Sequence, residues 1–161
     1  MLIRPLFALL VLLSCDPILP PGDGGPPVEP SLTLGTGEGR YRNFEDGEVL
    51  DIVSGCQGSQ HIWIALRAEG LDARGTIIDV SIRRASDDVV VSQTFRLRLS
   101  LQPVPGNLGL HEVYGLTLII PEPEEAIGEE LIVSAIVTDR GGTEVTDERT
   151  IGAAMGAGGC G

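Results

Sequence analysis

Apolar and polar side chains alternate along much of the central part of this 161-residue chain. The alternation is clearest over residues 60–68, 76–84 and 89–101. A period of two places successive side chains on opposite faces of a β-strand, so each segment predicts a strand with one face turned to a core. The residues predicted to point inward include Ile62, Ile64 and Leu66 in the first segment, and Val91, Phe95, Leu97, Leu99 and Leu101 in the third.

The rest of the chain predicts further strands separated by turns. They cover residues 110–120, 129–138 and 143–151, with weaker early strands at 32–34 and 49–53. Clusters of turn-forming residues occupy 102–107 and 139–142, and the second of these predicts a hairpin. No segment has a helical period, although 121–128 has room for one short turn. Aromatic residues make up only 4% of the chain, so the core must be built from Ile, Leu and Val.

The region around the second turn cluster, at residues 139–142, also resembles a known family. The stretch from Ile132 to Thr143 resembles the final hairpin of bacterial immunoglobulin-like domains, and residues 121–128 look like the loop that leads into it. The Cys…Trp…Cys arrangement of antibody domains is missing. Together with the strand spacing, the resemblance implies an all-β, antiparallel immunoglobulin-like sandwich of about seven to eight strands over residues 32–161. It implies no activity.

The N-terminus has the layout of a signal peptide. Arg4 is followed by an apolar run over residues 6–13 and then by Ser14 and Cys15. The run is shorter than the roughly 20 residues that span a bilayer, and it matches the apolar region of a secretory signal. An ordinary secretory signal with an incidental cysteine is the alternative interpretation.

The residues Leu12-Leu13-Ser14-Cys15 resemble the lipobox of bacterial lipoproteins. The resemblance implies that residues 1–14 are removed and that Cys15 becomes an N-terminus carrying fatty acyl chains such as palmitate. Two or three such chains anchor a protein stably to a membrane. Residues 15–31 then form a Pro/Gly-rich linker that we expect to be disordered. Asp16 resembles the signal for retention in the inner membrane of enteric bacteria, although the choice between inner and outer membrane stays open.

The other two cysteines form an even pair once Cys15 is lipidated. We expect a disulfide between Cys56 and Cys160, because exported proteins fold in an oxidising compartment. It would close a loop of about 100 residues and contribute roughly 4–5 kcal/mol in the chain-entropy description. An intermolecular disulfide and two free thiols are the alternatives.

One polar cluster is a candidate binding patch for a partner. It combines Gln57, Gln60, His61, Trp63 and Arg67, with Trp63 on the face opposite to Ile62 and Ile64. An exposed tryptophan beside a histidine and an arginine suits a protein interface. In the alternative interpretation, Trp63 packs beneath the N-terminal segment or a neighbouring loop.

Metal sites have weak support in the sequence. His61, His111 and Glu112 are suitable zinc ligands by residue type, but they lack a zinc-site spacing. The acidic runs at 87–88, 122–125 and 129–130 lack the ordered spacing of a calcium loop. We therefore predict no metal and no cofactor.

Charge and missing motifs narrow the function. The net charge is −12, which disfavours nucleic acid as a partner. The chain has no lysine, which excludes Schiff-base catalysis and the P-loop lysine, and it has no nucleophile elbow. We predict a non-enzymatic binding or protein-interaction module, held in the cell envelope by its lipid anchor, in the periplasm or on the cell surface. Its partners would be the membrane and another envelope protein. A structural spacer without a specific ligand is the alternative.

Overall fold

The computed structural model of the chain describes residues 28–55 and 58–157. These residues form nine strands and one 3₁₀ turn, η1 (Pro123–Glu125), so the all-β prediction and the short turn within 121–128 are confirmed. The strands are β1 (Ser31–Gly35), β2 (Glu48–Ser54), β3 (Gln60–Glu69), β4 (Thr76–Arg84), β5 (Phe95–Leu99), β6 (Gln102–Pro103), β7 (His111–Ile119), β8 (Leu131–Thr138) and β9 (Glu144–Met155). Cys15, Cys56, Gln57 and Cys160 lie outside the described residues, as do the predicted signal peptide and most of the predicted linker.

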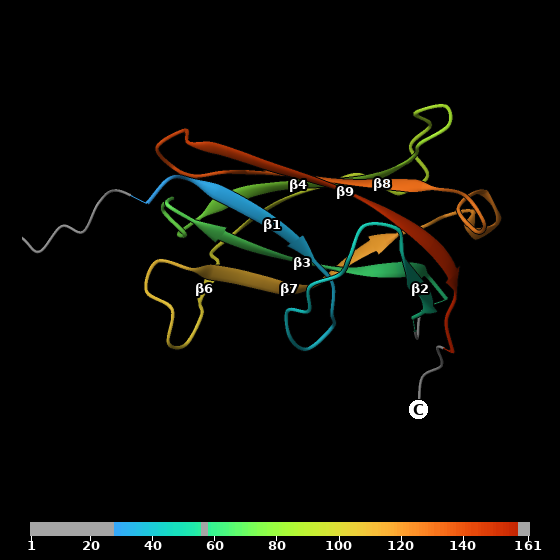
Figure 1. Cartoon of the computed structure of the whole chain (residues 1–161), viewed down its shortest axis with the longest axis horizontal. Helices are drawn as coiled ribbons and strands as arrows, with labels where there is room; N and C mark the ends of the chain where they lie inside the picture. Colours follow the sequence, from blue (N-terminus) through green and yellow to red (C-terminus); the bar gives the residue numbers. More distant parts are fainter. Residues whose placement is uncertain (1–27, 56–57, 158–161) are drawn as a thin grey trace, which may run out of the picture.

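The strands form one curled sheet whose two halves lie as layers (Figure 1). One half has the strand order β5-β4-β8-β9. The other half has the order β6-β7-β3, and β1 pairs with β3 on the side away from β7. The second strand, β2, joins them, since its first part pairs with β9 and its last two residues pair with β3. The pairing of β2 with β9 is parallel, so the prediction of a purely antiparallel sheet is wrong. Because β2 passes from one layer to the other, it is parallel to its neighbour β9 in one layer and antiparallel to its neighbour β3 in the other.

The core between the layers is aliphatic. Ile62, Ile64 and Leu66 of β3 are at most 1% exposed, as their alternation predicts. They pack with side chains from the opposite layer, such as Ile78, Ile82 and Val133 on β4 and β8. Each fully buried side chain of this size contributes about 1.5–3 kcal/mol relative to the exposed side chain.

The chain departs from prediction between residues 89 and 101. The backbone N–H of Val91 donates to Ile82 of β4, but the N–H of Gln93 donates to Ile119 of β7 in the other layer. Only then does the chain return to β4 as the short strand β5. The predicted single long strand is therefore wrong. Leu97 lies on the predicted inward face, opposite the buried Ile78, but it is 40% exposed.

The first predicted turn cluster also contains a strand. Gln102 and Pro103 form β6, which pairs with Glu112 and His111 at the start of β7. The hairpin predicted at 139–142 is confirmed by a hydrogen bond from Asp139 N to Thr143 O.

Candidate functional site

The predicted patch lies on β3 and is mostly covered. His61 is 5% exposed, while Gln60, Trp63 and Arg67 are half-buried. The rings of His61 and Trp63 meet edge to face, with their centroids 4.6 Å apart. Of the four described members of the patch, His61 therefore offers almost no surface to a partner.

The loop that follows β1 accounts for this cover. Thr36 Oγ1 donates to the carbonyl of Trp63, and Gly37 O accepts the N–H of Gly115 from β7, so the loop lies across β3. Ala65, on the outer face of β3, is fully buried as a result. Trp63 is half-buried beside this loop, and it lines an opening together with Thr36, Gly37 and Arg42.

Arg67 is also engaged within the protein. Its guanidinium stacks 4.1 Å above the Tyr41 ring, and its Nε lies 3.0 Å from a Glu112 carboxylate oxygen. Burial raises the pKa of Tyr41 above its usual value. The stacking on Tyr41 holds the loop against β3.

The residues considered for zinc are not brought together. His61 lies opposite Ile119, whereas His111 lies opposite Ala68 at the other end of the same strand pair. Seven residues of strand separate the two positions, which is roughly 23 Å. Within residues 28–55 and 58–157, no three metal-binding side chains gather into a site.

The acidic residues at 87–88 are paired with arginines. Asp87 accepts from Arg84 at 2.8 Å, and Asp88 lies 3.1 Å from Arg83. The hydrogen bond from Arg84 lowers the pKa of Asp87 below its usual value. These contacts are ordinary surface ion pairs.

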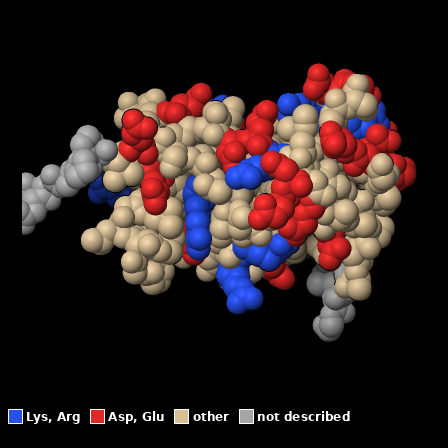
Figure 2. Space-filling model, viewed as in Figure 1, with Lys and Arg blue, Asp and Glu red and all other residues tan. Residues whose placement is uncertain are grey.

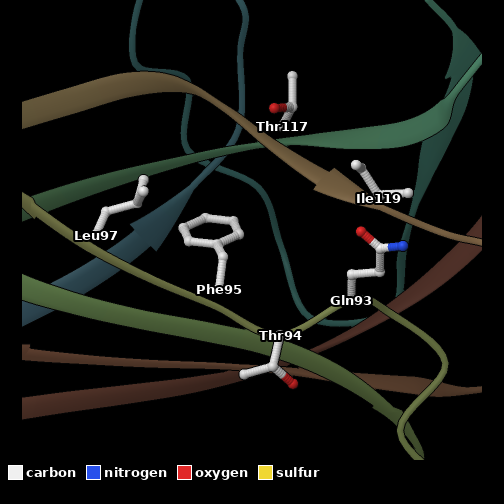
Figure 3. Close-up of a pocket in the computed structure, with 6 residues that line it drawn as sticks. All are labelled: Gln93, Thr94, Phe95, Leu97, Thr117 and Ile119. Atoms are coloured by element: carbon white, nitrogen blue, oxygen red, sulfur yellow. The ribbon is translucent and has the colours of Figure 1, made fainter.

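A different feature is an opening between β5 and β7 with a largely apolar lining. It is a cavity of about 220 Å³ lined by Gln93, Thr94, Phe95, Leu97, Thr117 and Ile119. Figure 3 shows Phe95 and Leu97 rising from β5 toward β7, which carries Thr117 and Ile119. The opening exists because the two halves of the curled sheet do not pair on this side.

Both walls of this opening are strand edges. In the described part of the chain β5 pairs only with β4. On the side of β7 away from β3, the described partners are β6, at His111 and Glu112, and the N–H of Gln93, which reaches Ile119 O. Unpaired strand edges present N–H and C=O groups that can pair with another chain.

The charge around the opening differs from that of the whole protein. Residues 89–111 contain no Asp or Glu, although the chain has 23 acidic residues. The same stretch carries Arg96 and Arg98 and four exposed large apolar side chains: Val89, Val90, Leu97 and Leu108. The lower-left end of Figure 2, where β6 and the loop after it lie, is uncharged in that view, whereas acidic groups are scattered over much of the rest. The residues that line the opening are thus uncharged, and the two charged residues of β5, Arg96 and Arg98, are both basic.

Sequence reasoning missed this site because it depends on two strands that meet only through the fold. The acid-free stretch was the one signal in the sequence that pointed to it. Among the described residues, no helix is long and apolar enough to cross a membrane.

Comparison with known proteins adds little. No protein-family model and no curated protein sequence matches the chain. Among solved structures, the chain is similar to Spo0M, a sporulation control protein from Bacillus subtilis, with a TM-score of 0.44 and 16% sequence identity. The match covers 79% of this chain and 50% of Spo0M, so the chain spans about half the length of that protein.

Proposed function

We propose that the chain is a lipid-anchored cell-envelope protein that acts as a non-enzymatic binding module through the opening between β5 and β7. The observation that carries this proposal is Leu97, a large apolar side chain that is 40% exposed on an unpaired strand edge beside a cavity of about 220 Å³. Apolar cavities with a few polar groups at the rim are the usual form of a binding site.

The anchoring part of the proposal rests on the lipobox resemblance at Cys15. The proposed tether would join the domain just before β1, which begins at Ser31. The linker expected over residues 15–31 would then hold the domain off the membrane by a chain that prolines stiffen. The membrane and another envelope protein are the proposed partners, in the periplasm or on the cell surface.

We further propose that the two layers form an immunoglobulin-like sandwich, and strand order supports this. In that family strands A, B, E and D share one sheet, while G, F and C share the other, with C′ added in variable-type domains. The orders β1-β3-β7-β6 and β9-β8-β4-β5 follow the same pattern along the chain. The additional strand here is β2, which passes between the sheets.

Site-specific photocrosslinking in intact cells tests the binding proposal. A photoreactive amino acid is placed at Leu97, at Trp63 in the predicted patch, or at Val49, a control that is 59% exposed. We expect one defined crosslinked species from Leu97 and none from Val49. A crosslink from Trp63 alone would move the binding surface to the β3 patch, and the absence of any specific crosslink would favour a structural spacer.

Anchoring is tested separately with labelled palmitate. The full chain is expected to incorporate the label and to be found in the membrane fraction. The Cys15→Ser variant should lose both properties. Incorporation that survives this substitution would refute lipidation at Cys15.

A further inference from the structure

We propose that the partner binds as an extended segment with alternating acidic and apolar side chains, which adds to the free edge of β5 as a further strand. The inference rests on the proposed function and specifies its partner. Strand addition of this kind draws affinity from main-chain hydrogen bonds and specificity from pockets for alternate side chains.

The two faces of β5 determine the pattern of the partner. Phe95, Leu97 and Leu99 share the face of the buried β4 residues they oppose, and Phe95 and Leu97 line the cavity. Arg96 and Arg98 project from the opposite face, and both are exposed. A neighbouring strand must repeat this alternation, because side chains opposite each other on one face interact directly. Its apolar residues therefore cover the cavity, and its other residues meet the arginines.

The charges of β5 require those other residues to be acidic. Arg96 lies 3.5 Å from Asp79 and remains 68% exposed, and Arg98 has no carboxylate within 4.0 Å among the described residues. With no acidic residue in 89–111, their charge is only partly balanced locally. A partner strand that carries carboxylates completes these pairs.

A second copy of this chain fits the same edge poorly. Antiparallel pairing of two β5 strands centred on Leu97 would place Arg96 of one copy opposite Arg98 of the other. Like charges directly opposite each other destabilise a strand pair. This pairing of two copies is therefore disfavoured, whereas an acidic strand complements the edge.

The chain's own linker is also an unsuitable occupant. Residues 15–31 include six prolines, which have no backbone N–H to donate to a neighbouring strand. The occupant that best fits the edge belongs to another protein.

Binding of defined peptides tests the inference with the full lipidated chain in a non-ionic detergent. The probe is a fluorescent seven-residue peptide of alternating valine and glutamate, and its matched control replaces each glutamate with lysine. We expect the acidic peptide alone to bind, with slower amide hydrogen exchange in residues 94–100. The double variant Arg96→Gln/Arg98→Gln should weaken binding by about two- to thirtyfold. The double variant Arg40→Gln/Arg42→Gln, which removes two exposed arginines from the loop over β3, should leave binding unchanged.

Each contrary outcome has a definite meaning. Equal binding of both peptides, or acidic binding without protection of residues 94–100, would overturn the inference. Failure of the acidic peptide to bind would also overturn the inference. The proposed function would still stand in that case if a partner is crosslinked through Leu97. Crosslinks through Leu97 between two copies of this chain would replace the inference with self-association.

Discussion

Gly115 on β7 is a position at which one added methyl group should disrupt the loop over β3. It has φ +73°, a conformation that side chains other than glycine rarely adopt. It also forms a bulge in β7, where the register against β3 shifts. A Cβ at this position would lie 2.7 Å from the carbonyl oxygen of Glu38, in the loop that covers β3. Gly115→Ala therefore combines an unfavourable backbone conformation with a steric clash.

The expected cost follows from these two terms. The left-handed conformation costs an alanine about 1–2 kcal/mol. The clash must push the loop outward and break the 2.9 Å hydrogen bond from Gly115 N to Gly37 O, which adds about 0.5–1.5 kcal/mol. Gly115→Ala should thus lower the free energy of unfolding by roughly 1.5–3.5 kcal/mol.

Two other glycines separate the terms. Gly142 has φ +87° with nothing within 4 Å of an added Cβ, so Gly142→Ala isolates the backbone term. Gly39 has neither a positive φ nor a neighbour within 4 Å, so Gly39→Ala should be close to neutral. Urea unfolding followed by fluorescence of Trp63, the one tryptophan of the chain, measures all three. Equal unfolding midpoints for Gly115→Ala and Gly142→Ala would refute the proposed contact between the loop and β7.

Three further predictions concern other parts of the fold. Asp147→Ala should lower the free energy of unfolding by about 1–3 kcal/mol. The reason is that Asp147 Oδ2 accepts a hydrogen bond from the N–H of Leu34 at 2.7 Å and so connects β1 to β9. Asp147→Asn keeps an acceptor and should cost less stability in the same urea titration. Two backbone N–H groups lower the pKa of Asp139 below its usual 3.8. The stabilising effect of the ionised Asp139 should therefore be complete above about pH 4 and lost as the pH falls through the lowered pKa. The difference in stability between the wild-type protein and the Asp139→Asn variant should then shrink in acid. A difference that stays constant with pH would contradict this. Reduction of a Cys56–Cys160 disulfide should lower stability by roughly 4–5 kcal/mol, and an identical urea midpoint with and without reductant would show that the disulfide is not formed.

The sequence predicted those parts of the fold that depend on local pattern. The strand expected over 76–84 coincides with β4, because each of its apolar side chains meets one continuous core. The stretch 89–101 was mispredicted because its path is set by the bond between Gln93 and Ile119, which are 26 positions apart. Alternation predicts which face of a strand a side chain occupies, but it does not predict which other strand will pair with it.

The same limit explains the outcome at the predicted patch. Alternation correctly placed Trp63 on the face of β3 away from the core, but the pattern contains no information about a loop laid over that face. The cover comes from contacts such as Thr36 with Trp63 and Arg67 with Tyr41, which join residues 27 and 26 positions apart. A period of two distinguishes the two faces of a strand, but it does not show that a loop contacts one of them.

The two long sides of the curled sheet differ in what they offer to another chain. On one side β2 pairs with both β9 and β3 and so joins the two layers through backbone hydrogen bonds. On the other side β5 and β7 face each other across a cavity, and the N–H of Gln93, just before β5, donates to Ile119 O of β7. An exposed edge is a hazard for self-association unless charge protects it, and Arg96 and Arg98 supply that charge on the open side. The same two arginines repel a second β5 strand and attract an acidic strand, because both arginines are positively charged. Protection from self-association and selection of a partner are therefore achieved by the same pair of residues.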